Sequence, residues 1–449
     1  MRREQLIESA AYRNRDVRHV TNSVSPLPSP RRIHGGLLIV MLIMACFGLI
    51  MLFSASMSGS FDQEGDAMYV VFRQAGITAM GLAVALILAV AIPLKLFDHF
   101  WMSAILYVIT SGLLVYVKLF GVVINSARRW IRIPVFGTFQ PSELAKLAMV
   151  FCFAGYVSMV RRRRAKGKCR FKTKLGQFLA DGWIDILFPF LAFLVWLGLI
   201  LWQPHLSATL ILGFVMLAMF LAAGIRLRSW ISAITQMVLI LVIIALLVGV
   251  ALPALKAKGF EETIEKNFAH VEKRLDTFLN PESASADDTY QIDQSVIAMG
   301  SGGLSGVGLG SGRQKYNYLP EPYNDFIFAV IGEELGFIGT LSVILLFVLF
   351  LLMGVGITYR APNAFGAVLA GGYTMLISIQ AFLNIAVATK TIPATGISLP
   401  LFSYGGTSNL FFLLAIGFIL AVSKTGRLQG QELAERSPSA TARRTGGRP

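Results

Sequence analysis

The chain has 449 residues, of which 55% are hydrophobic and only 14% charged, and its mean hydropathy is +0.65. Soluble globular proteins of this length do not reach such values, so the composition indicates an integral membrane protein. The formal net charge of +15 would suit nucleic acid, but basic residues in cytoplasmic tails and loops fix topology and contact anionic lipid. Membrane lipids, and not nucleic acid, are therefore the expected partners.

Apolar runs of about 20 residues, enough to cross a hydrocarbon core of roughly 30 Å, follow one another along the chain. They predict an all-α polytopic protein with about ten transmembrane helices, at residues 35–56, 70–93, 100–120, 142–160, 184–202, 205–224, 229–253, 324–357, 364–388 and 405–423. The eighth run exceeds one span, so it should tilt or include a part outside the lipid. The expected divisions are a basic tail at 1–34, a membrane domain at 35–425 with one large loop at 254–322, and a second tail at 426–449.

Lys and Arg in the short loops predict the orientation in the membrane. The densest basic cluster, residues 161–174, is placed in the cytoplasm by the positive-inside rule. Ten spans then put both termini in the cytoplasm and the 254–322 loop outside, together with the acidic loop around Asp62, Glu64 and Asp66.

The segment between the third and fourth spans breaks this rule, because Arg128, Arg129 and Arg132 fall on the predicted outer side. Guanidinium groups form bidentate bonds with phosphate oxygens, so the cluster indicates a phosphate-bearing lipid or substrate. A lipid headgroup anchor, with Trp130 as an interfacial aromatic, explains it equally well.

Glu143 and Lys146 lie three residues apart at the start of the fourth span, so they share one helix face and can pair. One interpretation is an internal ion pair that makes membrane insertion tolerable. The other is that Lys146 points toward an anionic group and Glu143 orients it.

The stretch 319–339 puts three carboxylates, Asp325, Glu333 and Glu334, into an otherwise apolar run. A charged side chain near the middle of a span costs roughly 2.5–3.5 kcal/mol, so such residues usually mark functional sites. Pro322 fits the first turn of a helix, which would place Asp325 one turn in.

An ionised Asp325 could act as a general base that accepts a proton from a hydroxyl. Its ionisation stays open, because the helix macrodipole favours the charged form whereas burial raises the pKa. Glu333 lies eight residues further on, roughly 12 Å along a helix, so it forms no close carboxylate pair with Asp325. We expect Glu333 and Glu334 to make polar contacts inside the bundle.

Three further segments are expected on the outer side. The glycine-rich run 300–312 lacks the ending of a nucleotide-binding loop, so it predicts a re-entrant or flexible segment that lines a cavity. Residues 261–278 predict a short surface helix, and 384–408 predict irregular backbone beside the membrane. The segments 125–146, 300–312 and 384–408 should surround Asp325.

No pattern predicts protein ligands for a metal. His205 and His270 have no ligand spacing, and the three cysteines, Cys46, Cys152 and Cys169, offer neither a CxxC motif nor an external disulfide.

Four motifs occur in order across these spans: NSARRWI with FQPSELAK, DTYQIDQSVIAMGSGGLSGVGLG, LPEPYNDFIFAVIGEELG, and TGISLPLFSYGGTS. Together they resemble the SEDS family of cell-wall glycosyltransferases, particularly its FtsW branch, over roughly residues 35–425. The resemblance implies polymerisation of lipid II, in which the 4-hydroxyl of one disaccharide attacks C1 of a growing glycan. Undecaprenyl diphosphate leaves and a β-1,4 bond forms with inversion. Asp325 matches the family's essential aspartate, so it is the expected catalytic residue.

The leaving diphosphate needs cations, which Arg128, Arg129, Lys146 or a divalent metal such as Mg²⁺ or Mn²⁺ could supply. No other cofactor is expected. The predicted substrate-binding residues are Arg128, Arg129, Trp130, Glu143, Lys146, Glu321, Lys390 and Ser403.

The sequence departs from the family pattern at three places. Gln203-Pro204-His205-Leu206-Ser207-Ala208 stands where QPDxGT is usual, which puts the role of that acidic position in doubt. Ala386 and Lys390 replace common glycines, and NSA at 125–127 replaces NGA.

The family implies a monofunctional class B penicillin-binding protein as the crosslinking partner, other division proteins, and a role in division rather than elongation or sporulation. A lipid II flippase is the rival function. A transporter should show charges at mid-membrane and paired repeats with broken helices, whereas here the polar groups gather on the outer side and no convincing repeat is present. A scaffold without catalysis would leave the placement of Asp325 unexplained.

Overall fold

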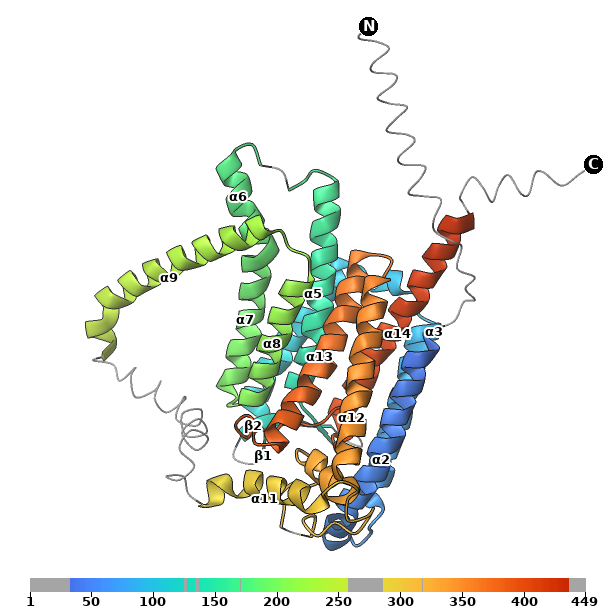
Figure 1. The fold of residues 1–449 in the computed structure, drawn as a ribbon. Coiled ribbons are helices and arrows are strands. Elements are labelled where there is room, and N and C mark those ends of the chain that lie inside the picture. The colour runs from blue at the N-terminus through green and yellow to red at the C-terminus, as the bar shows by residue number, and fades with distance from the viewer. Residues whose placement is uncertain are drawn as a thin grey trace, which may run out of the picture. The chain divides into compact units, whose positions relative to one another are not determined.

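The computed structural model describes residues 33–124, 127–133, 137–169, 171–256, 286–316 and 318–435. Within these ranges nine helices are long and apolar enough to span a membrane, and the sixth predicted span, at 205–224, is α8, an apolar helix of 17 residues. The predicted all-α fold is therefore confirmed (Figure 1). The helices are α2 (Gly35–Glu64), α3 (Tyr69–Val90), η1 (Leu94–Leu96), α4 (Phe100–Phe120), α5 (Pro141–Ala165), α6 (Lys174–Gly182), η2 (Trp183–Leu187), α7 (Phe188–Trp202), α8 (Leu206–Ala222), α9 (Leu227–Lys256), α11 (Ala286–Gly302), α12 (Ile327–Tyr359), α13 (Ala364–Ala388) and α14 (Gly406–Glu435). The predicted surface helix at 261–278 and most of both predicted tails lie outside the described residues.

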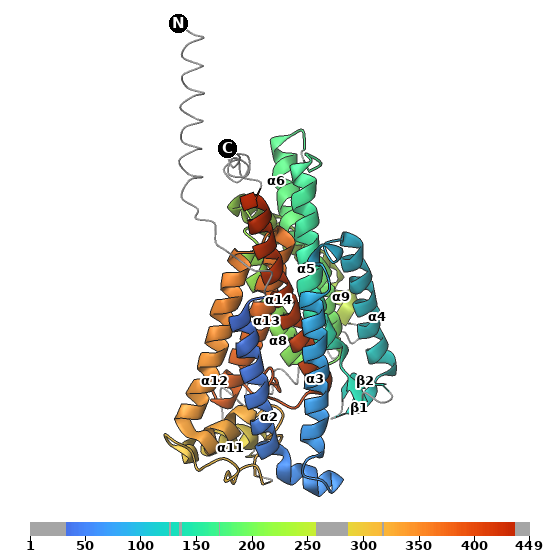
Figure 2. The same ribbon diagram turned by 90° about the vertical axis from the view of Figure 1, so that its right-hand side faces the viewer.

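Helices α5 and α13 form the centre of the bundle. Most of their residues are buried, and they pack on each other and on α8. Helix α12 packs along α13 and α2, and α3 lies beside α2 (Figure 2). We call the two ends of the bundle the α6 end and the α11 end, after the helices seen there in Figure 1.

Several helices run further than the apolar pattern predicted. Helix α2 continues to Glu64, so Asp62 and Glu64 lie on its last turn and not in a loop. Helix α5 continues to Ala165 through its arginine run, and the fifth span begins at Lys174, ten residues before the predicted 184. Polar residues can extend a helix beyond the lipid, because a helix of 30 residues is about 45 Å long and the hydrocarbon core only about 30 Å thick.

A small antiparallel sheet, which the sequence did not predict, connects α4 to α5. It comprises β1 (Val122–Ile124), β2 (Ala127–Ile133) and β3 (Gly137–Phe139). Arg128 pairs with Val123, and Arg132 pairs with Thr138. The strands thus hold the arginine cluster in an extended backbone at the α11 end.

Helix α12 is broken at Gly336, whose φ of 65° and ψ of −160° are not helical. The glycine-rich loop that follows α11 bridges the break. Its carbonyl groups at Gly303 and Leu304 accept from the N–H groups of 337 and 338, at 2.9 and 3.2 Å. Its N–H groups at 307 and 308 donate to the carbonyls of Glu333 and Glu334, both at 3.0 Å.

The loop therefore satisfies backbone groups that the break would otherwise leave unpaired, as burial near a membrane requires. The eighth run exceeds one span because it contains a short helix of nine residues before this break. Of the two predicted alternatives, a re-entrant or a flexible segment, the flexible one is wrong, because hydrogen bonds fix this loop to α12.

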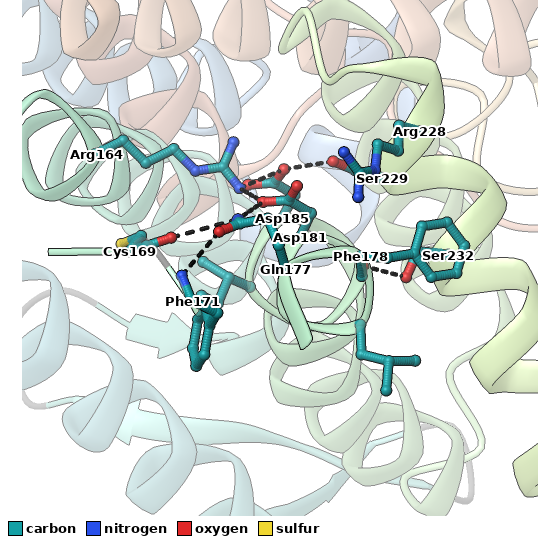
Figure 3. Close-up of polar contacts among 12 residues, drawn as sticks. Arg164, Cys169, Phe171, Gln177, Phe178, Asp181, Asp185, Arg228, Ser229 and Ser232 are labelled. Carbon is teal, nitrogen blue, oxygen red and sulfur yellow. Dashed lines mark hydrogen bonds and ion pairs between the residues drawn. The ribbon is translucent and has the colours of Figure 1, made fainter. Parts of the chain in front are cut away.

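Helix α9 packs on α6 and η2, and in Figure 1 it points away from the other helices. Figure 3 shows the side chains that hold its first turns. Arg164 donates to Asp181 and Asp185, both at 2.9 Å, and Ser229 of α9 donates to Asp185 at 2.7 Å. Ser232 donates to the Phe178 carbonyl at 2.6 Å. These contacts connect the arginine run of α5 to the base of α9.

Candidate functional site

Asp325 lies in a turn that precedes α12, which begins at Ile327 with Phe326 as its N-cap. The predicted position one turn into a helix is wrong, and Pro322 likewise lies before the helix and not in its first turn. The sequence 319–326 begins with prolines at 320 and 322 and forms successive turns, so the helix starts only at the first apolar run after them.

Two elements far away in the sequence contact this turn. Asn384, on α13, donates its side-chain Nδ2 to the Asp325 backbone carbonyl at 2.7 Å and to the Ile397 carbonyl at 2.5 Å. The Asp325 carboxylate lies beside Gly396, where a Cβ would come 3.3 Å from Asp325 Oδ2. Asn384 thus joins the Asp325 turn to the loop between α13 and α14.

Asp325 is partly buried, and its environment favours the neutral acid. The surrounding protein displaces water and, together with a smaller contribution from the negative charge of Glu321, raises the pKa of Asp325 to about 6. Glu321 itself is exposed, has a positive φ of 52°, and accepts a hydrogen bond from Asn324 Nδ2. A carboxyl group that titrates near pH 6 is suited to proton transfer at neutral pH.

Glu143 and Lys146 form a buried ion pair on the first turns of α5. Lys146 Nζ lies 2.8 Å from Glu143 Oε1, and the two side chains are 2% and 10% exposed. Lys146 also donates to Gln380 Oε1 of α13 at 2.7 Å. Glu143 and Lys146 thus form the predicted pair, and the ammonium group is oriented by two acceptors.

Gln380 carries this connection to the same loop that contacts Asp325. Its Nε2 donates to the Ser398 carbonyl at 3.2 Å, next to Ile397, which Asn384 holds. Gln380 and Asn384 are one helical turn apart on α13 and both are buried. The structure therefore brings Lys146 and Asp325 to opposite ends of one polar chain, which runs through α13 and the 397–398 backbone.

The arginine strand lies against the α7–α8 connection. Arg129 donates to the carbonyls of Gln203 and Pro204, through Nε at 3.2 Å in the first case. Arg128 is exposed and donates to the Leu119 carbonyl at 3.1 Å. Trp130, partly buried, pairs with Val122 in the hairpin.

His205 is the N-cap residue of α8 and is buried. Its Nδ1 lies 3.3 Å from Gln140 Nε2 and 3.2 Å from Ser142 Oγ. These neighbours are neutral, so the histidine here belongs to a polar contact between α8 and the start of α5.

The remaining two predicted substrate-binding residues have other contacts. Lys390 is exposed and pairs with Asp293 of α11 at 2.7 Å. Ser403 is buried, and its Oγ accepts from the Leu399 N–H at 2.7 Å, which closes a turn of the loop. Neither contact involves the Asp325 carboxylate.

Sequence reasoning missed Gln380 and Asn384. A signal was present, because two amide side chains four residues apart share one face of an otherwise apolar span. It also missed Lys315, which forms a buried ion pair with Glu334.

In the described ranges no group of three or more His, Cys, Asp or Glu side chains could hold a metal ion by itself. The Asp325 turn offers two carboxylates, those of Asp325 and Glu321. Mg²⁺ is commonly bound by one or two carboxylates together with substrate phosphates, and Glu321 here is exposed and accepts a hydrogen bond from Asn324.

Comparison with known proteins identifies the family. The FtsW/RodA/SpoVE model, described as "Cell cycle protein", matches residues 36–428. The chain belongs to the FtsW/RodA/SpoVE family. A relative in Geobacter sulfurreducens named "Probable peptidoglycan glycosyltransferase FtsW" is 34% identical over 395 residues, covering 88% of this chain and 95% of the relative. "Stage V sporulation protein E" of Bacillus subtilis is 35% identical over 395 residues, covering 87% and 97%.

Solved structures share the fold of this FtsW/RodA/SpoVE protein. A chain of a complex titled "Structural coordination of polymerization and crosslinking by a peptidoglycan synthase complex" aligns with a TM-score of 0.60 at 22% identity, covering 88% of this chain and 98% of that one. The rod shape determining protein RodA of Thermus thermophilus aligns with a TM-score of 0.56 at 23% identity, covering 87% and 96%.

Proposed function

We propose that this protein polymerises lipid II into β-1,4 glycan strands and releases undecaprenyl diphosphate. Curated relatives that match almost their whole length are named peptidoglycan glycosyltransferases, and this chain is a peptidoglycan glycosyltransferase. The observation that carries the finer proposal is Asp325, a carboxylate of raised pKa that is held in place by Asn384 at the α11 end.

Asp325 would act as the general base for the attacking 4-hydroxyl group. Attack at C1 with loss of diphosphate inverts the anomeric centre in one displacement, so no covalent nucleophile is needed. The base must be ionised, and a pKa of about 6 leaves it so at neutral pH while keeping it basic enough to take a proton.

The diphosphate would require cations. Lys146 and Arg129 are already oriented by protein acceptors, whereas Arg128 is exposed on its strand. A divalent cation that arrives with the diphosphate would supply additional positive charge to its oxygens. Buried oxygens near this chain of contacts, on Glu143, Asn384 and Thr395, accept no hydrogen bond from the described residues, and such atoms are suited to bind a polar ligand or solvent.

The flippase alternative receives less support. In the described spans the buried charged side chains are at the ends of the bundle: Glu143, Lys146, Glu333 and Glu334 near the α11 end, and Asp181 near the α6 end. A transporter of an anionic lipid would be expected to carry such groups near the midplane.

We place the α11 end outside the bacterial cell membrane and both termini in the cytoplasm, because the positive-inside rule assigns the arginine run of α5 to the inner side. The proposed crosslinking partner is a class B penicillin-binding protein, in keeping with a fold shared with a chain of a peptidoglycan synthase complex. We further propose that the strands serve septal synthesis in division.

The test is glycan formation by the purified protein from fluorescent lipid II, alone and with its class B partner. We expect a ladder of polymers that a muramidase digests. A protein that forms no polymer in either condition, yet moves lipid II across vesicle bilayers, would be a flippase.

The pH dependence of the reaction provides a separate prediction. Since the raised pKa of Asp325 is about 6, the rate should fall as pH drops through about 6 and the base becomes protonated. Glu321→Gln removes a negative charge that raises this pKa, so the acidic limb should move to lower pH. Initial rates between pH 4.5 and 8 measure this shift, and an unmoved limb in the variant would exclude Glu321 as a determinant of the pKa.

A further inference from the structure

A second buried ion pair lies at the α11 end, in a position that the sequence did not reveal. Lys315 Nζ is 2.6 Å from Glu334 Oε1, and the two side chains are 1% and 0% exposed. Ser54 of α2 bonds to both carboxylate oxygens of Glu334, at 2.7 and 2.6 Å. Three elements thus meet at this pair: α2, the loop after α11, and α12.

The hydrogen bonds of the pair are complete. The Lys315 ammonium group has three protons and three acceptors, namely Glu334, Ser54 at 3.0 Å and the Gly310 carbonyl at 2.9 Å. Glu334 Oε2 also accepts from the Gly310 N–H at 3.1 Å. No donor or acceptor is left for a ligand, so the pair is a rigid junction and not a binding site.

The neighbouring residue, Glu333, reinforces this junction. Its Oε1 accepts from the N–H groups of Arg313 and Gln314, at 2.7 and 3.2 Å. Glu333 and Glu334 therefore bind the loop at residues 310 and 313–315.

The pair closes a segment of chain around Asp325. Lys315 lies ten residues before Asp325, and Glu334 nine residues after it. Because both ends of this segment meet at one buried contact, the turn that carries the carboxylate lies in a closed loop, which has fewer conformations than an open one.

We propose that Lys315 and Glu334 are positioning residues, whose ion pair holds the Asp325 turn in the geometry that glycosyl transfer requires. The inference rests on the proposed function. A stabilising role alone would not require charge, because a buried ion pair often gives no more stability than apolar side chains of similar volume. What the pair adds is a fixed orientation of the loop relative to α2 and α12, because its hydrogen bonds go to defined atoms of Gly310 and Ser54.

Stability and activity should therefore separate in the double variant Lys315→Met/Glu334→Leu, which removes both charges together. We expect its thermal midpoint to stay within a few degrees of wild type and its KM for lipid II within about twofold, while kcat falls at least tenfold. Lys315→Met alone should lower the midpoint, because it leaves Glu334 charged and buried without a partner. The matched control is Arg162→Gln/Asp98→Asn, which removes an ion pair with an exposed arginine at the α6 end and should leave kcat unchanged.

Hydrogen–deuterium exchange gives a readout that does not depend on the enzymatic reaction. Peptides covering 316–326 should exchange at least tenfold faster in the double variant, with α13 unchanged. A double variant with wild-type kcat and wild-type exchange would overturn the proposal, as would a loss of kcat that accompanies general unfolding. If the wild type makes no polymer but the exchange differs as expected, the proposed reaction fails while the fixing of this turn by the pair stands.

Discussion

Asp325→Asn should reduce glycan polymerisation by about 10²–10⁴-fold, the contribution typical of a positioned general base. The amide keeps the size of the side chain and the backbone contact with Asn384, but it cannot accept the proton of the attacking hydroxyl. The measurement is the initial rate of polymer formation at pH 7.5, at equal amounts of folded protein.

The same substitution should not destabilise the fold. Because the folded protein raises the pKa of Asp325 from 3.8 to about 6, ionisation at neutral pH disfavours the folded state, and a neutral amide removes that cost. Asp325→Asn should therefore unfold at or above the wild-type temperature. Asp98→Asn is the control: it converts a carboxylate that pairs with Arg162 at the α6 end, and it should retain most activity at pH 7.5. A variant at position 325 that polymerises at the wild-type rate would remove this carboxylate as the base.

Gly306→Ala should lower the free energy of unfolding substantially. A Cβ at Gly306 would overlap the Glu334 carbonyl group, so the loop would have to leave the break in α12. The cost combines a positive φ with overpacking against backbone, about 3 kcal/mol or more. Thermal unfolding in detergent, followed by gel filtration of the soluble fraction, measures the change.

Gly310→Ala separates these two causes. Both glycines have a φ of 81°, but nothing lies within 4 Å of a Cβ at Gly310. We expect Gly310→Ala to cost only the conformational strain, about 1–2 kcal/mol. Equal losses in the two variants would mean that the close contact between Gly306 and α12 contributes nothing to stability.

The membrane spans could be predicted because crossing lipid depends on local composition. All ten apolar runs became helices at the expected places. The predicted ends of the spans were less accurate, because polar residues such as those at 161–165 continue a helix beyond the apolar run. The hairpin β1–β2 was missed because its strands are short and carry arginines where an apolar pattern would be read.

The candidate site was predicted in part. Asp325 and the Glu143–Lys146 pair stood out as charges in apolar sequence, and the structure joins them through the loop at 397–398. Their surroundings could not be derived, because Asn384 contacts a backbone carbonyl 59 residues away in sequence. The start of α12 depends on turn geometry after two prolines, so Asp325 was placed in the helix when it precedes it.

The Lys315–Glu334 pair also bears on how the eighth span enters the membrane during synthesis. Glu334 is the eighth residue of α12, and a carboxylate in an inserting helix carries a cost that reaches roughly 2.5–3.5 kcal/mol at the helix centre. Lys315 precedes Glu334 by 19 residues, so both Lys315 and Ser54 of α2 are synthesised before Glu334. We therefore expect insertion of α12 to depend on these partners as well as on the hydrophobicity of the isolated segment.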